Sequence, residues 1–265
     1  MIQVAVRVRP LLSDENSSSL VESHDASTLS VSGRKFKFDA VFDATSTQAS
    51  IFSQSMQPLI AHVLSGSHAT VFAYGATGCG KTHTMTGTLQ NPGLIPRTIS
   101  NLYKHLPRAS QISISFLEVY NESIRDLLSE ATNLAIREDD SANRVLVSGL
   151  SEHSPKSEQH FLRLITRGTE NRSVGFTNAN AVSSRSHSIL LINITEITNK
   201  VTTLSLIDLA GSERASSTMN SGIRLTEGAN INKSLLSLAN CINALYTNST
   251  TKSRKKHVPY RYITL

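Results

Sequence analysis

The stretch Gly75-Ala-Thr-Gly-Cys-Gly-Lys-Thr82 decides how the rest of the sequence is interpreted. It fits G-x-x-x-x-G-K-[ST] in full and follows Thr70–Tyr74, a short apolar run with the pattern of a buried strand. In such a loop, backbone N–H groups surround phosphate oxygens, a lysine neutralises their charge and a hydroxyl binds magnesium. The stretch therefore predicts a phosphate-binding loop. The residues expected at the nucleotide are Gly75, Ala76, Thr77, Gly78, Cys79, Gly80, Lys81 and Thr82.

A second acidic residue at the end of a neighbouring strand usually completes such a site by holding the metal through water. Leu204-Ser-Leu-Ile-Asp208 supplies an apolar strand that ends in a carboxylate. Taken alone, a strand ending in Asp is more often structural than catalytic. Beside a phosphate-binding loop, we expect Thr82 and Asp208 to serve the same magnesium ion.

Strand and helix patterns alternate along the chain. Residues 2–8, 36–42, 70–74, 112–120, 188–198 and 201–209 are expected strands, and 143–168 a short strand pair followed by a helix. Helical spacing covers residues 48–64, 98–106 and about 229–245. The order predicts one domain over residues 1–265 with the α/β fold of P-loop NTPases. Its central, mostly parallel, twisted sheet would carry helices on both faces.

Composition limits the class of protein. Hydrophobic residues make up 39% and charged residues 17%, which is ordinary for a folded soluble chain. The 26 Lys and Arg against 20 Asp and Glu give +6, which favours an acidic partner. Two cysteines are too few for a disulfide framework and indicate a reducing, cytosolic compartment. The N-terminus has no signal-peptide pattern, and no window approaches a membrane span.

Two further motifs carry a resemblance. Asn180-Ala-Val-Ser-Ser-Arg-Ser-His187 and Asp208-Leu-Ala-Gly-Ser-Glu213 resemble switch I and switch II of the kinesin motor family. Other blocks resemble the family in the correct order, and together they cover essentially the whole chain. These blocks are Arg7–Pro10, Phe116–Glu122 with Asp126–Leu128, Asn230–Leu235 and His257–Arg261.

The resemblance implies a microtubule-stimulated ATPase that binds ATP or ADP with Mg²⁺. It places Arg7, Pro10 and His83 at the adenine and adds Arg9 to the nucleotide-binding residues. It gives Ser183 and Ser184 to the closing switch I loop, with Ser184 at the metal, and makes the Gly211 N–H a sensor of the γ-phosphate. An ion pair between Arg185 and Glu213 would latch the two loops, while Lys81 neutralises charge and Glu213 relays a proton from water.

The segment Lys252–Arg261 holds five of the 26 basic residues, a charge density suited to an acidic surface. In an unknown protein it would be interpreted as a solvated basic loop. The resemblance implies that it contacts tubulin, together with the preceding helix, which would act as the switch II relay. The residues expected at the microtubule are Lys233, Lys252, Arg254, Lys255, Lys256, His257, Tyr260 and Arg261.

Other partners follow from the same resemblance. We expect no nucleic acid and no membrane, and oligomerisation through segments not present here. Ile136–Asp139, Val145–Leu150 and Phe161–Gly168 look most like the kinetochore-associated, centromere-protein type. That type suggests a cytoplasmic protein on the cytoskeleton, at the mitotic spindle.

After Arg261 the chain departs from the family pattern, in which a helix, a sheet strand and a last helix follow. We expect those elements to be missing. An alternative function is therefore a non-motile or catalytically weak microtubule-binding module. A P-loop kinase or GTPase is less consistent with the sequence, because Asn230-Ile-Asn-Lys is not the guanine-reading pattern.

Overall fold

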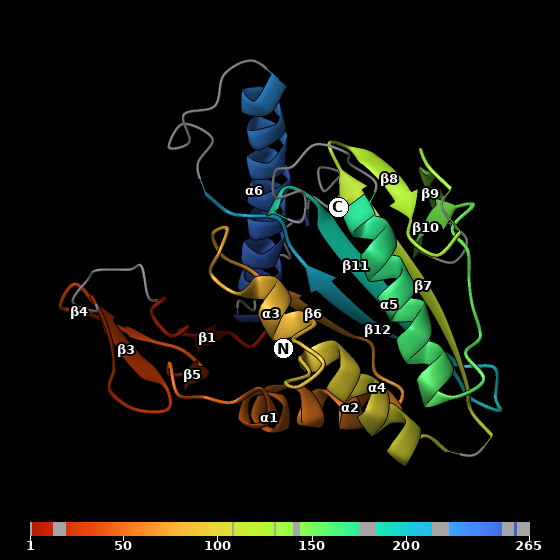
Figure 1. Ribbon diagram of the computed structural model, residues 1–265, viewed down its shortest axis with the longest axis horizontal. Helices are drawn as coiled ribbons and strands as arrows, with labels where there is room; N and C mark the ends of the chain where they lie inside the picture. Colours follow the sequence, from red (N-terminus) through yellow and green to blue (C-terminus); the bar gives the residue numbers. More distant parts are fainter. Residues whose placement is uncertain are drawn as a thin grey trace.

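The computed structural model describes residues 2–12, 20–107, 109–129, 131–139, 144–174, 184–213, 223–250 and 257–258. Its centre is a twisted sheet of five strands with helices packed on it (Figure 1). In spatial order the strands are β6 (Ala69–Ala73), β12 (Val201–Asp208), β11 (His187–Thr195), β7 (Gln111–Tyr120) and β8 (Ser123–Asp126).

Three smaller strand groups lie outside this sheet. β1 (Ala5–Arg7) pairs in parallel with β5 (Ala40–Phe42). β2 (Val21–Ser23), β3 (Thr28–Val31) and β4 (Arg34–Lys37) form an antiparallel sheet in a separate lobe, on the left of Figure 1. β9 (Ala135–Asp139) and β10 (Arg144–Ser148) form a hairpin. The alternating stretch predicted as one strand over residues 36–42 is thus two strands that belong to different sheets.

The helices occupy both sides of the central sheet. The first helical stretch is α1 (Gln48–Ile51), a π-helical turn η1 (Phe52–Met56) and α2 (Gln57–Leu64). The others are α3 (Lys81–Met85), α4 (Leu94–His105), α5 (Glu158–Val174) and α6 (Ile223–Thr250).

Side-chain alternation along β11 shows how α5 and α6 are placed. Successive side chains of a strand point to opposite faces. Ser188 accepts a hydrogen bond from Arg172 of α5 at 3.1 Å, and its neighbour His187 lies 3.3 Å from Ser234 of α6. The two helices therefore lie against opposite faces, and the predicted α/β fold with helices on both faces is confirmed.

The main hydrophobic core lies between the sheet and α2, α4 and α5. Its most buried members include Ile60, Leu102 and Phe161 from the three helices and Leu190 and Leu204 from the strands. These residues hold the strand ends, and hence the site, in fixed positions. Burying each such side chain contributes about 1.5–3 kcal/mol.

The sheet is mixed, where the sequence predicted a mostly parallel one. β6 pairs with β12 in parallel, but β12 pairs with β11, β11 with β7 and β7 with β8 in antiparallel fashion. The physical reason is the length of the connections, because short turns such as Asn199-Lys200 can join only antiparallel neighbours. Among the described residues β6 is an edge strand, and its Phe72 side chain is 38% exposed.

Candidate nucleotide site and its connection to helix α6

The predicted phosphate-binding loop leads from β6 into α3. Gly78 and Gly80 have φ angles of 79° and 95°, a left-handed conformation that glycine adopts without steric cost. A Cβ atom built on either glycine would meet nothing within 4 Å, so the loop surrounds open space. Lys81 is 8% exposed, and its Nζ donates to the carbonyls of Gly75 and Ala76 at 2.9 and 3.0 Å. In this structure the Lys81 ammonium therefore binds the backbone of the loop itself.

Strand register brings a row of polar side chains to the loop. Glu118 of β7 lies opposite Ser188 of β11, which lies opposite Asp208 of β12, which in turn lies opposite Ala73 at the end of β6. Thr82, in the first turn of α3, donates from its hydroxyl to Asp208 at 2.7 Å. Thr82 and Asp208, which the sequence assigns to the same magnesium ion, are thus in direct contact.

Arg172 of α5 lies over this row and is 7% exposed. Its guanidinium donates to Asp208 Oδ2 at 3.1 Å and to the Ser186 carbonyl at 2.9 Å, and lies 3.6 Å from Glu118. A buried guanidinium needs partners of this kind because losing them would leave a charge without water or counter-charge. The arrangement fixes the position of the Asp208 carboxylate.

The residues at this point fit a magnesium ion. Asp208 Oδ1 is buried and, among the described residues, has no hydrogen-bond partner, so one carboxylate oxygen remains available. The Thr82 hydroxyl lies against the same carboxylate. Hydroxyl and carboxylate oxygens are the hard ligands that magnesium prefers. Within the described part of the chain, no group of three His, Cys, Asp or Glu forms a separate metal site.

Switch II packs directly on the loop. The Gly211 N–H donates to the Ser184 carbonyl at 2.6 Å, and the Ser212 N–H to the Gly75 carbonyl at 3.1 Å. The Gly211 N–H, expected to sense the γ-phosphate, is thus bonded to the end of switch I. Ser183 and residues 180–182 of switch I lie outside the described residues.

The described contacts of Glu213 are with the phosphate loop. Its carboxylate accepts from the Thr77 N–H at 2.9 Å and from the Thr77 hydroxyl. Partial burial raises the pKa of Glu213, but the hydrogen bonds from Thr77 outweigh it and the pKa is lowered overall. The expected latch between Arg185 and Glu213 is not among the described contacts. The backbone N–H and the hydroxyl of Thr77 hold the Glu213 carboxylate instead.

The base end of the site is assembled from three elements. Arg7 of β1 donates to Gln48 at 3.2 Å and to Thr84 of α3 at 2.9 Å, and burial lowers the pKa of the Arg7 guanidinium. His83 is exposed and contacts Gln48 as well. The structure thus joins Arg7 and His83 through a shared partner. The described side-chain hydrogen bond of Arg9 goes instead to the carbonyl of the adjacent Pro10.

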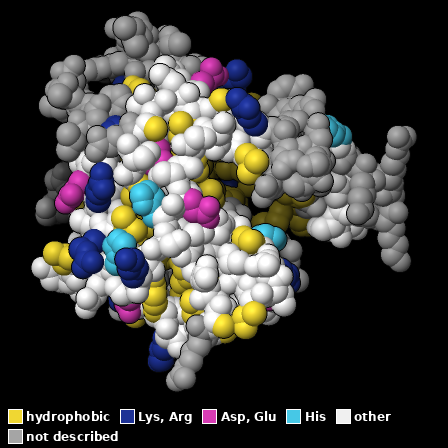
Figure 2. Space-filling view, turned by 90° about the vertical axis from the view of Figure 1, so that its right-hand side faces the viewer, with side chains coloured by type: hydrophobic (Ala, Val, Ile, Leu, Met, Phe, Trp, Pro, Cys, Tyr) yellow, Lys and Arg dark blue, Asp and Glu magenta, His cyan; other side chains and the backbone are white. Residues whose placement is uncertain are grey.

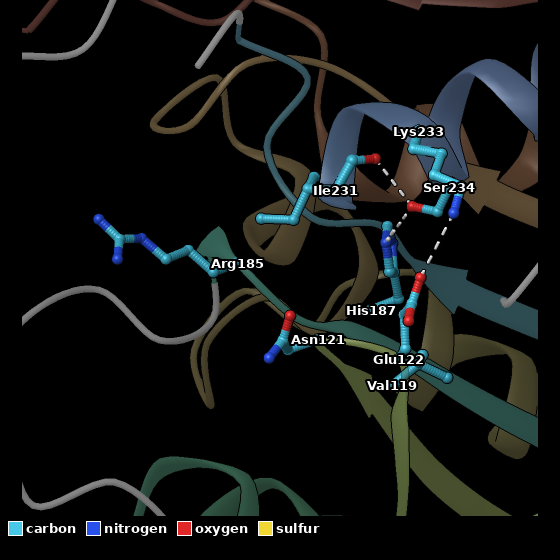
Figure 3. Close-up of a pocket in the computed structure, with 8 residues that line it drawn as sticks. All are labelled: Val119, Asn121, Glu122, Arg185, His187, Ile231, Lys233 and Ser234. Carbon is cyan, nitrogen blue, oxygen red and sulfur yellow. Dashed lines mark hydrogen bonds and ion pairs between the residues drawn. The ribbon is translucent and has the colours of Figure 1, made fainter. Parts of the chain in front are cut away.

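A buried histidine connects switch II with α6, and Figure 3 shows its contact with Ser234 of that helix. His187 is 3% exposed; its Nδ1 accepts from the Ala210 N–H at 3.0 Å and its Nε2 lies 3.3 Å from Ser234 Oγ. Burial, then repulsion from Arg172 and Lys81, lowers the pKa of His187 to about 4. The ring is neutral at physiological pH, so Nε2 carries the ring hydrogen and donates a hydrogen bond to Ser234 Oγ. The Ser234 hydroxyl in turn donates to the Ile231 carbonyl.

Most of the expected microtubule contacts cannot be placed. Lys252, Arg254, Lys255, Lys256, Tyr260 and Arg261 lie outside the described residues. His257 is exposed, and Lys233 on α6 is exposed with an ion pair to Glu122 at 3.6 Å. The face in Figure 2 carries Lys and Arg side chains in small groups between acidic and neutral ones. That face, as far as it is described, presents no continuous basic surface.

Sequence reasoning missed Arg172, Glu118 and Gln48. Arg172 sits in a polar helix and gives no signal. Glu118 did give one, because it occupies the inward-facing position that Ile112, Ile114 and Phe116 occupy before it. A charged residue in that pattern indicates a buried partner of opposite charge.

The fold and the site together define the P-loop NTPase fold, with switch II and the end of switch I beside the loop. A family profile described as kinesin motor domain matches residues 5–265. The chain belongs to the kinesin motor family.

Relatives support the assignment. The chain is 49% identical over 244 residues to "Kinesin-like protein KIP3" of Saccharomyces cerevisiae, covering 86% of this chain and 30% of that protein. It is 48% identical over 240 residues to "Kinesin-like protein KIF18A" of Mus musculus, covering 86% and 27%. The chain thus spans about 30% of the length of these relatives. Their names do not support the predicted likeness to the centromere-protein type.

Solved structures agree with this result. A structure titled "Structure of a fast kinesin: Implications for ATPase mechanism and interactions with microtubules" is 37% identical, with a TM-score of 0.87 over 99% of this chain and 78% of that one. Another, titled "kinesin 6", is 26% identical with a TM-score of 0.83 over 99% and 87%. In the described part of the chain, no helix combines the length and the apolar character needed to cross a membrane.

Proposed function

We propose that residues 1–265 form a single motor domain that hydrolyses ATP to ADP and phosphate and couples hydrolysis to microtubule binding and movement. The observation that carries the proposal is that the phosphate loop contacts both ends of switch II, at Asp208 and at Glu213. Thr82 of the loop bonds to Asp208, and Glu213 of switch II bonds to Thr77 of the same loop. A loop that merely bound phosphate would not need a second acidic segment held against it.

The residues divide the chemistry between them. Lys81 exchanges the carbonyls of Gly75 and Ala76 for phosphate oxygens, to which its charge is better matched. Thr82 and Asp208 hold Mg²⁺, which when bound supplies positive charge to the phosphates. Ser183 and Ser184 close over the γ-phosphate as switch I. The nucleotide is ATP or ADP, by likeness to the family.

Glu213 has to leave Thr77 before it can take part in hydrolysis. Its carboxylate then pairs with Arg185 and orients the attacking water through a second water. The Gly211 N–H, bonded here to Ser184, turns to the γ-phosphate in the same change. These exchanges replace one set of hydrogen bonds with another of similar number, so a modest differential affinity is enough to drive them.

The link through His187 carries the change to the track side. Ala210 stands next to Gly211, and His187 joins Ala210 to Ser234 of α6. A shift of Gly211 toward phosphate therefore pulls on α6, the helix that includes Lys233. Lys233, His257 and the basic residues between 252 and 261 form the contact with tubulin. An acidic lattice attracts them, and salt screens the attraction.

The localisation follows from this partner. The protein acts in the cytoplasm on the microtubule cytoskeleton, with the mitotic spindle as one site. Its family likeness supports microtubules as the partner, in place of nucleic acid or a membrane. Oligomerisation would use segments outside these residues.

The test measures ATP turnover with and without polymerised microtubules. The Glu213→Ala variant should lose stimulated turnover, whereas Glu170→Ala, which removes an exposed carboxylate from α5, should retain it. Salt-sensitive pelleting with microtubules in the absence of any turnover would refute the motor proposal. That result would favour the non-motile microtubule-binding module.

A further inference from the structure

Gln48 is a polar side chain with no exposure to water, at the start of α1. It lies between β1 and α3, the two elements that carry Arg7 and His83. A buried amide is tolerated when its oxygen and nitrogen are both bonded, and it is costly otherwise. The way in which Gln48 meets this requirement defines its role.

The partners of Gln48 fix the orientation of its amide. A guanidinium can only donate, so the amide oxygen must face Arg7, and Oε1 accepts from Arg7 Nη1 at 3.2 Å. The nitrogen then faces His83, where it donates to the backbone carbonyl at 2.6 Å and lies 3.3 Å from Nδ1. Nδ1 therefore accepts, and the neutral imidazole carries its proton on Nε2.

The same network reaches the phosphate loop. Arg7 also donates to the Thr84 hydroxyl at 2.9 Å, and that hydroxyl donates to the Gly80 carbonyl at 2.8 Å. Arg7 thus has two supports, Gln48 and Thr84. For the His83 ring, Gln48 is the side-chain partner that the described contacts provide. Loss of Gln48 should therefore loosen the His83 side more than the Arg7 side.

We propose that Gln48 is a positioning residue for the base of the nucleotide. It sets the spacing between Arg7 and His83 and the orientation of the imidazole, so that a flat heteroaromatic base fits between them. This inference rests on the proposed function, which assigns Arg7 and His83 to the base. Because the described hydrogen bonds of Gln48 go to Arg7 and His83 and reach the phosphate loop only indirectly, it governs affinity for the nucleoside more than affinity for the polyphosphate.

The test compares magnesium ATP with magnesium tripolyphosphate, which lacks the base and ribose. Dissociation constants for both are measured by calorimetry on the nucleotide-free chain, on Gln48→Met and on Gln54→Met. Methionine keeps the length of glutamine but has no hydrogen to donate and accepts only weakly. Gln54 is an exposed glutamine of the same helical stretch. The readout is the dissociation constant for tripolyphosphate divided by the dissociation constant for ATP.

For Gln48→Met this ratio should fall about tenfold, as expected from the loss of hydrogen bonds that hold a contact surface in place. Gln54→Met should keep the wild-type ratio. A Gln48→Met ratio equal to wild type, or equal weakening of both ligands, would overturn the inference. If the wild-type chain binds tripolyphosphate as tightly as ATP, the base assignment in the proposed function fails instead.

Gln48→Glu provides a second route if the methionine variant does not fold. A carboxylate still accepts from Arg7 but has no hydrogen to give to His83. The ratio should fall about threefold, as for one lost support. An unchanged ratio in this variant would refute the role of the His83 contact.

Discussion

Replacing His187 with Asn should remove a large part of the pH dependence of stability. The folded pKa of His187 is about 4, because the ring is buried and faces Arg172 and Lys81, whereas a histidine in the unfolded chain has a pKa of 6.5. As pH falls from 6.5 toward 4, His187 becomes protonated in the unfolded state but stays neutral in the folded state. The contribution of His187 to stability is therefore fully present above pH 6.5 and is lost as pH falls toward 4.

The magnitude follows from the pKa difference of about 2.5. At about 1.4 kcal/mol per pH unit, the full decline is about 3 kcal/mol. About 2 kcal/mol of it falls between pH 7.5 and pH 5, where unfolding is readily measured. Asparagine does not titrate in this range, and its oxygen can still accept from the Ala210 N–H.

The assay is urea unfolding at pH 7.5, 6 and 5 for wild type, His187→Asn and His62→Asn. His62 is exposed on α2 and controls for the removal of any histidine. The free energy of unfolding of His187→Asn should fall by about 2 kcal/mol less than that of wild type across this range. Parallel pH profiles for wild type and His187→Asn would show that His187 is not held neutral, and the reasoning would be wrong.

Three further predictions concern stability and metal binding. Gly168→Ala should destabilise the protein by about 1–3 kcal/mol in thermal unfolding, although alanine favours helices, because the new Cβ would lie 2.3 Å from Phe116 Cδ1; an unchanged or higher Tm would contradict this. Asp126→Asn should cost about 1–3 kcal/mol in urea unfolding, because the buried carboxylate accepts from three backbone N–H groups, and equal stability would count against it. Thr82→Ala should weaken ADP binding in magnesium but not in EDTA, and equal weakening in both would refute a role beside Asp208 in holding the metal.

The sequence alone determined the local parts of the site. The phosphate-binding loop, the strand ending in Asp208 and most element positions follow from short-range patterns, because turn geometry and side-chain alternation depend on neighbouring residues. The placement of Thr82 beside Asp208 was predictable because the ends of parallel strands meet at one edge. The predicted α/β architecture is also confirmed, because the order of strand and helix patterns along the chain is itself a short-range property.

The tertiary structure alone decided which distant groups meet. Register across three strands aligns Glu118 with Asp208, and only then does Arg172, 36 residues away from Asp208, become their shared partner. The contact between Glu213 and Thr77 likewise depends on which donor is nearest in space. In the sequence Gln48 looked like an ordinary helix residue. Only its burial between β1 and α3 makes its amide bond to Arg7 on one side and to His83 on the other. Such contacts depend on the packing of whole elements, which short-range sequence patterns do not encode.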